Sequence, residues 1–200
     1  MNEKTGKMRI LQYNWLFPPH PLAGGRANIC KYFSKFLALK GHEVIVLTTR
    51  CKGIPSQTFK DNFRVIRIGV CYSGNRFMDY VRKVIQQFVD YLWLRNNLKE
   101  FHIFHIHAPT YGVTFQTLWK KRYRAIFKGW IKATKKVNVP VIVQFHGMID
   151  EQNRNLVENY LNDSSQADLI ITVCHETRSK LIKLGLKKEI IVTVSYTHLR

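Results

Sequence analysis

The sequence has few acidic residues and no long apolar run. Asp and Glu number 13 among 200 residues, against 32 Lys and Arg, which gives a formal net charge of +19 at pH 7. No stretch approaches the roughly 18 consecutive apolar residues of a membrane-spanning helix. Hydrophobic residues nevertheless make up 46% and aromatic residues 12% of the chain, which excludes intrinsic disorder as its main state.

Cysteines are also scarce and scattered. None of the four forms a CxxC pair, which argues against a disulfide framework or a thiolate zinc site and favours reduced thiols: Cys30, Cys51, Cys71 and Cys174. Residues 1–7 are polar and do not resemble a secretory signal peptide. A cytoplasmic location is therefore expected, either free or peripheral on the inner face of the cytoplasmic membrane.

Residues 101–149 contain eight basic residues and no Asp or Glu, so their positive charge is not balanced by acidic side chains. Apolar residues recur there at helical spacing, and basic residues recur on another face of the same expected helix. One interpretation is a helix that lies on an anionic membrane or another polyanion, and the other is a core-packed helix with a solvated cationic face. No named nucleic-acid motif occurs, so nucleic acid is not expected as a partner. The residues of this candidate surface are Lys120, Lys121, Arg124, Lys128, Lys132 and Lys135.

Short apolar runs alternate with longer amphipathic segments along the chain. Strands are expected at residues 8–13, 44–48, 63–68, 103–107, 141–145, 169–173 and 190–194. Helices are expected at residues 26–39, 77–99, 113–136, about 151–162 and 176–184, and a loop around residues 53–56. Strands that are apolar on both faces lie between two helix layers, so the pattern predicts an α/β fold with a doubly wound, mainly parallel, Rossmann-like sheet of about seven strands.

The turn after the first expected strand contains two adjacent glycines. Ligands of doubly wound sheets bind at the carboxyl ends of the strands, and Gly24 and Gly25 stand there at the entrance of the first helix. Main-chain N–H groups at such a place favour a phosphate or another oxyanion, although a plain tight turn is the alternative. The turn is not GxGxxG and the second strand ends without an acidic residue, which disfavours NAD; Arg50 keeps NADP as a distant alternative.

Histidines end two other expected strands. His105 and His107 share one face of a strand, but a third ligand at HExxH spacing is missing, so no metal is expected. His146 is followed by Gly147, which permits a sharp turn at the strand end. Such a histidine either points into the binding crevice, to meet a hydroxyl or a developing charge, or is satisfied by main-chain carbonyls.

Taken together, these motifs resemble the N-terminal domain of family 4 glycosyltransferases, the retaining group with the GT-B fold. The most specific match is residues 37–48, LALKGHEVIVLT, and the opening strand with its glycine turn precedes it. Three further segments match in order: HIHAP at 105–109, PVIVQFHG at 140–147 and ADLIITVC at 167–174, the last with Cys174 in place of the usual serine and followed by Thr177 and Arg178.

The resemblance implies a reaction and a set of roles. A sugar is transferred from a nucleoside-diphosphate sugar to a glycan or lipid-linked acceptor, with retention of configuration and with neither a metal nor another cofactor. By this resemblance His146 is the catalytic residue near the transferred sugar, and Gly24 and Gly25 lie beside the donor phosphates. Candidates on the acceptor side are His107, Gly147 and Arg178.

The resemblance stops before the end of the chain. Residues 1–194 are expected to form the acceptor-side domain, whereas residues 195–200 do not match the family pattern. A donor-binding C-terminal domain, with the paired glutamates and basic clamp of the family, is not found in the 200 residues. The sequence therefore predicts one half of a glycosyltransferase that is inactive by itself, or else a non-catalytic basic module that binds a polyanion.

Overall fold

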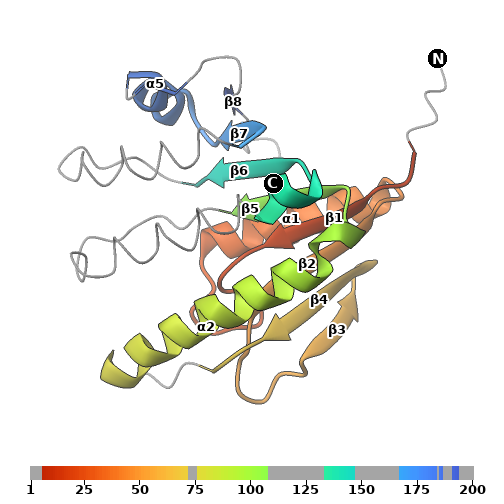
Figure 1. Cartoon of the computed structure of the whole chain (residues 1–200), viewed down its shortest axis with the longest axis vertical. Helices are drawn as coiled ribbons and strands as arrows, with labels where there is room; N and C mark the ends of the chain where they lie inside the picture. Colours follow the sequence, from red (N-terminus) through yellow and green to blue (C-terminus); the bar gives the residue numbers. More distant parts are fainter. Residues whose placement is uncertain are drawn as a thin grey trace. The chain divides into compact units, whose positions relative to one another are not determined.

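A computed structural model describes residues 6–71, 76–107, 133–146, 167–183, 185–186 and 191–193. The chain divides into two compact units, Met1–Phe104 and His105–Arg200. Figure 1 labels the helices and strands and colours them in chain order.

The first unit is a parallel sheet with one antiparallel hairpin at its edge. Its elements are β1 (Arg9–Tyr13), α1 (Gly25–Leu39), β2 (Glu43–Thr49), β3 (Gln57–Lys60), β4 (Phe63–Ile68) and α2 (Arg76–Asn97), followed by the 3-10 helix η1 (Leu98–Glu100) and the start of β5 (Ile103–His107). Its strands have the order β3-β4-β2-β1. β1 and β4 each pair with β2 in parallel, and β3 pairs with β4 in the antiparallel sense.

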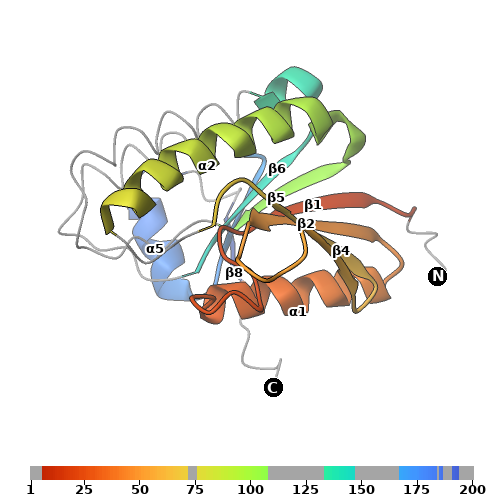
Figure 2. The ribbon, with the colours of Figure 1, turned by 90° about the horizontal axis from the view of Figure 1, so that it is seen from below.

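Helices α1 and α2 lie on opposite faces of this sheet (Figure 2). On the α1 face, Cys30 and Phe17 pack with Val44, Val46, Phe63 and Val65 in a buried hydrophobic cluster. On the other face, α2 reaches the sheet through a hydrogen bond between Asp90 and Tyr13. With a helix on each face, β1 and β2 are buried at every residue except the first.

The second unit continues the parallel pattern. It contains β6 (Val141–Phe145), β7 (Leu169–Thr172), α5 (His175–Lys183) and β8 (Ile191–Thr193), and residues 133–137 form a helical turn before β6. The strand order is β5-β6-β7-β8, and β7 pairs in parallel with both β6 and β8.

The structure confirms the expected α/β, mainly parallel, Rossmann-like fold. Each of the seven expected strands is present, and α1, α2 and α5 lie within a few residues of their expected bounds. The loop expected around residues 53–56 is confirmed, and residues 57–60 directly after it form β3, a strand that was not expected. Of the helix expected at 113–136 only residues 133–136 are described, and residues 151–162 lie outside the described residues.

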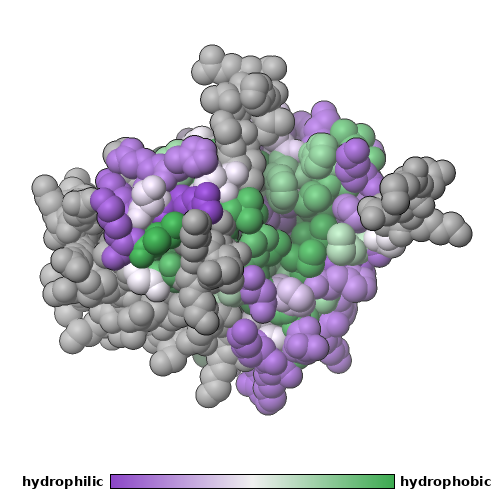
Figure 3. Space-filling view, turned by 90° about the horizontal axis from the view of Figure 1, so that it is seen from above, coloured by the Kyte–Doolittle hydropathy of each residue, from purple (hydrophilic) through white to green (hydrophobic). Residues whose placement is uncertain are grey.

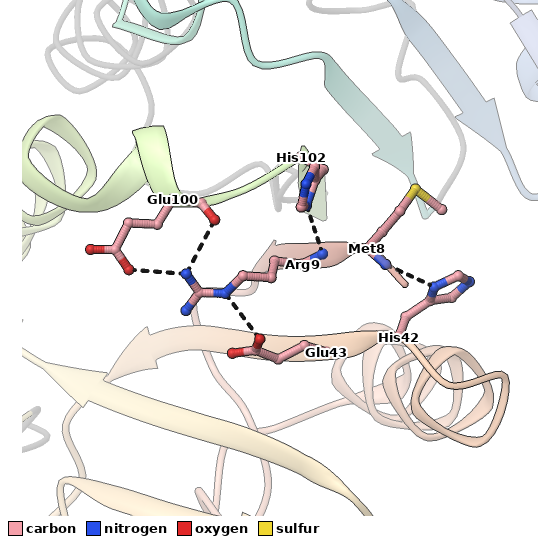
Figure 4. A network of polar contacts seen from close by, with 6 residues as sticks. All are labelled: Met8, Arg9, His42, Glu43, Glu100 and His102. Carbon is pink, nitrogen blue, oxygen red and sulfur yellow. Dashed lines mark hydrogen bonds and ion pairs between the residues drawn. The ribbon is translucent and has the colours of Figure 1, made fainter. Parts of the chain in front are cut away.

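A network of polar contacts connects the amino ends of β1, β2 and β5 (Figure 4). The Arg9 guanidinium contacts Glu43 at 3.0 Å and Glu100 at 3.2 Å. The main-chain N–H of Arg9 donates to Nδ1 of His102 at 2.9 Å, and that of Met8 to Nδ1 of His42 at 3.3 Å. Since β1 and β2 start at Arg9 and Glu43, this network belongs to the edge of the sheet opposite to the carboxyl ends of the strands.

None of the helices within the described ranges is both long and apolar enough to cross a membrane.

Candidate functional site

Two of the candidate histidines meet in the second unit. His107 is the last residue of β5, and His146 directly follows β6. Their Nδ1 and Nε2 atoms are 2.9 Å apart, and the rings are stacked with 23° between their planes and 5.1 Å between their centroids. His107 is 1% exposed and His146 is half-buried. The carboxyl ends of β5 and β6 therefore hold a hydrogen-bonded imidazole pair.

His105 extends this pair by a third ring. It lies 4.3 Å from the ring of His107, centroid to centroid, with 30° between the planes. Burial lowers the pKa of His105 to about 4, and a hydrogen bond with the Gln144 side chain opposes this shift. His105 is therefore uncharged at neutral pH, and this neutral ring packs against His107. Among the described residues, no group of three or more His, Cys, Asp and Glu side chains is arranged to hold a metal ion.

The glycine turn lies in the first unit. Gly24 is the N-cap of α1 and Gly25 is its first residue, and no side chain caps the helix there. The Gly24 carbonyl accepts the N–H of Ala27 at 2.9 Å. Both glycines are exposed, and a Cβ built on either would meet no atom within 4 Å. The packing of this chain thus does not require glycine at either position, whereas close approach of a ligand to the backbone would.

A buried arginine that the sequence analysis missed holds the loop before this turn. Arg67 is 3% exposed on β4. Its guanidinium donates to the carbonyls of Pro18 and Pro55, each at 3.3 Å, and to the Thr58 hydroxyl at 2.9 Å. Burial lowers the pKa of Arg67, and nearby Cys51 opposes this shift. In the sequence, Arg67 is merely one basic residue in an apolar strand, so nothing distinguishes it from a solvent-facing cation.

Arg178 lies on α5, which begins next to Cys174. Its main-chain N–H donates to the Cys174 carbonyl at 3.2 Å, and its buried Nε has no hydrogen-bond partner among the described residues. The Cys174 sulfur lies 3.2 Å from the Thr177 hydroxyl and accepts its main-chain N–H at 3.5 Å. These hydrogen bonds lower the pKa of Cys174, and the thiol occupies the place of an N-cap hydroxyl.

Comparison with protein families identifies the group to which the chain belongs. The model of Glycosyltransferase Family 4 matches residues 23–195. The chain belongs to glycosyltransferase family 4. A comparison with curated protein sequences returned no match.

Solved structures share the fold of this family 4 chain. Sucrose-phosphate synthase from Thermosynechococcus elongatus is 12% identical with a TM-score of 0.62, over 96% of this chain and 90% of that chain. HepE from Anabaena in complex with UDP and glucose is 11% identical with a TM-score of 0.57, over 94% of this chain and 44% of that chain. UDP-N-acetylglucosamine 2-epimerase from Rickettsia bellii is 13% identical with a TM-score of 0.54, over 95% of this chain and 45% of that chain. This chain thus spans less than half the length of HepE.

Several candidate residues of this family 4 chain lie outside the described residues. They are Gly147, Lys120, Lys121, Arg124, Lys128 and Lys132. The segment 195–200 also lies outside the described residues. Lys135 is described; its exposed ammonium lies 3.8 Å from the Asp168 carboxylate. Among the other candidates, the structure joins His107 to His146, and it places Gly24 and Gly25 together in the other unit.

Proposed function

We propose that this chain is the acceptor-binding half of a retaining glycosyltransferase. The enzyme would transfer a sugar from a nucleoside-diphosphate sugar to a glycan or lipid-linked acceptor, without a metal or another cofactor. The observation that carries the proposal is the imidazole pair at the carboxyl ends of β5 and β6 in a family 4 chain. The carboxyl ends of parallel strands are where such sheets bind ligands.

Two elements of the reaction are proposed, and each is described by itself. His146 would contact the transferred sugar and stabilise the charge that develops as the glycosidic bond to the diphosphate breaks. The main-chain N–H groups at the start of α1 would bind phosphate oxygens of the donor. Gly24 and Gly25 have no side chains that would keep a ligand away from these groups. Gly147 and Arg178 would contribute on the acceptor side. The UDP and glucose bound to HepE, a protein of the same fold, support a nucleotide sugar as the co-substrate.

The first test measures sugar transfer by this chain joined to a donor-binding domain of the same family. His146→Ala should lower kcat/KM about tenfold or more, because one interaction with the transition state is lost. His175→Ala, an exposed histidine of α5, serves as the control and should retain full activity. A chelator should leave turnover unchanged. Unchanged transfer by His146→Ala would remove the catalytic role of this residue.

A glycine variant tests the phosphate-binding turn separately from stability. Gly25→Ala should lower transfer while the free energy of unfolding stays the same or rises by up to about 1 kcal/mol, since alanine orders more easily than glycine in a helix. Gly41→Ala is the matched control: Gly41 has a φ of +91°, so alanine should cost about 1 kcal/mol of stability there and leave the kcat/KM of the folded enzyme unchanged. Full activity of Gly25→Ala would exclude close ligand contact at α1.

A second candidate function is peripheral binding to anionic lipid, and the solvent side of α1 supports it. Tyr32, Phe36 and Leu39 lie on one side of this helix and are 58%, 52% and 65% exposed. α1 contains no acidic residue, and Lys40 places its ammonium 5.6 Å from the centre of the Phe36 ring. Lys35, also exposed, lies 3.7 Å from Asp61. An apolar stripe bordered by lysines suits the boundary between acyl chains and anionic headgroups.

The lipid-binding candidate is tested with vesicles of phosphatidylcholine, alone and mixed with phosphatidylglycerol. Hydrophobic residues reach the described surface between hydrophilic ones (Figure 3), so exposure by itself does not identify a membrane contact. Replacement of the three α1 side chains by serine should abolish the part of the co-sedimentation with anionic vesicles that persists at high salt. The control replaces Ile85, Phe88 and Leu92 of α2, which are 44%, 61% and 38% exposed, and should bind normally. Equal losses in both variants would contradict a specific role of α1.

A further inference from the structure

The hydrogen bond between His107 and His146 restricts where protons can reside. It joins Nδ1 of His107 to Nε2 of His146 at 2.9 Å. A neutral imidazole carries one N–H and one acceptor nitrogen, so the two facing nitrogens share a single proton. If both facing nitrogens were protonated, two N–H groups would point at each other and the hydrogen bond would break. The state of one ring is therefore coupled to the state of the other.

The surroundings make His107 the fixed member of the pair. His107 is 1% exposed, and its ring centroid lies 4.3 Å from that of His105, which is equally buried. Burial holds the pKa of His105 at about 4, so this neighbour is neutral when the pair is studied at pH 7. His146, in contrast, lies directly after β6 and is half-buried. A rigid ring on β5 thus contacts a more accessible ring at the end of β6.

We propose that His107 is a positioning residue that accepts the Nε2–H of His146 and thereby keeps Nδ1 of His146 as a hydrogen-bond acceptor. In this arrangement both rings keep the proton on Nε2, which is the more stable tautomer of a free neutral histidine side chain. The reverse arrangement, with Nδ1–H of His107 as the donor, would require the less stable tautomer of both rings. The hydrogen bond that one ring nitrogen of a histidine makes decides whether the other ring nitrogen is protonated.

The consequence of this tautomer for catalysis rests on the proposed function of His146. Nδ1 of His146 is a buried atom, so the tautomer places a lone pair, and not an N–H, at that position in the second unit.

The direct test is ¹⁵N NMR of the histidine side chains in the 200-residue chain at pH 7. The expected spectrum has Nε2 of His146 protonated, Nδ1 of His107 and of His146 unprotonated, and a scalar coupling across the bond. In His107→Phe the coupling disappears and His146 becomes a mixture of tautomers, whereas His107→Asn, whose side-chain oxygen can accept the same N–H, retains the single tautomer. The control His175→Gln should leave the signals of the pair unchanged.

The result that would overturn the proposal is a tautomer mixture at His146 in the unchanged chain, or a protonated Nδ1 on either ring. This spectrum is independent of catalysis, because it is recorded without substrate. In the chain joined to a donor-binding domain, His107→Phe should lower kcat about ten- to a hundredfold, the cost of a misplaced group, and His107→Asn should restore most of it. If the spectrum is as expected but His146→Ala transfers sugar normally, the positioning holds and the catalytic function fails.

Discussion

Asp90 shows at the scale of one residue how burial changes an ionisable group. Its carboxylate, fully buried on α2, accepts the Tyr13 hydroxyl at 2.7 Å and the Gln86 amide at 2.8 Å. Burial raises the pKa of Asp90 to about 7, and the two hydrogen bonds oppose this shift without cancelling it. The protonated form is therefore favoured in the folded chain over a range of pH in which an exposed aspartate is ionised.

The sign of the resulting pH dependence follows from the raised pKa. The folded state binds the Asp90 proton between about pH 4 and pH 7, where the unfolded state has released it, so stability is lost as the pH rises through this range. Above about pH 7 the loss is complete, and it amounts to at most about 4 kcal/mol. Urea unfolding of Asp90→Asn should show a smaller decrease from pH 5 to pH 8 than the unchanged chain.

The control for this prediction removes an exposed carboxylate from the other unit. Glu176→Gln, which ends an ion pair of 3.1 Å with Lys180 on α5, should keep the pH dependence of the unchanged chain, because exposed ion pairs contribute little. An unaltered pH dependence in Asp90→Asn would show that the buried carboxyl is not its source.

Arg67 represents the scale of the structural element, since it connects β4 with two loops and with β3. Its hydrogen-bond partners are the carbonyls of Pro18 and Pro55 and the hydroxyl of Thr58. The loop that leads to Gly24 is also held by His20, whose Nδ1 accepts the N–H of Leu22 at 3.1 Å. Burial lowers the pKa of His20, which suits this acceptor role.

Removal of the Arg67 guanidinium should loosen these connections. Arg67→Met leaves buried oxygen atoms without donors and should lower the free energy of unfolding by about 2–3 kcal/mol. Arg64→Met is the matched control, because Arg64 is an exposed residue of the same strand; its expected effect is below about 0.5 kcal/mol. Chemical denaturation measures both. Equal effects of the two substitutions would contradict the structural role of Arg67.

Strand β3 marks the limit of pattern-based prediction at the element scale. The seven expected strands contain short apolar runs, and the sequence displays such runs directly. β3 is four residues long and mostly exposed, including Phe59 at 75%. Its conformation depends on pairing with β4 and on the contact between Thr58 and Arg67, neither of which a local pattern reveals.

At the scale of the whole molecule, the net charge of +19 governs interactions with anions. A strongly cationic surface attracts polyanions over a range set by the Debye length, about 10 Å at 0.1 M salt and about 3 Å at 1 M. Retention on immobilised heparin should therefore weaken steeply as salt increases. Replacement of Lys120, Lys121 and Arg124 by glutamate should weaken it further at low salt.

A polyanion such as heparin and an anionic membrane can be distinguished by how binding to each depends on salt. The serine variant of Tyr32, Phe36 and Leu39 should retain heparin binding, because it leaves the charge unchanged, while losing the part of vesicle binding that persists at high salt. Heparin retention that does not respond to salt would show that net charge is not its source.

The amino-acid sequence by itself determined the class of fold, the family and the ends of the strands at which functional residues stand. These properties are local: buried strands require apolar runs, helices end at glycine, and short motifs such as HIH and FHG occupy strand ends. The candidate residues Gly24, Gly25, His107 and His146 were found in this way.

Only the tertiary structure decided which of these side chains meet. His107 and His146 are separated by 39 residues, and Tyr13 and Asp90 by 77. Whether such side chains make contact depends on strand order, on register and on the face of the sheet that a helix covers, and none of these is encoded in a local pattern. For this reason, three features are properties of the folded chain: the hydrogen-bonded imidazole pair, the buried Asp90 and the hydrogen bonds of the Arg67 guanidinium.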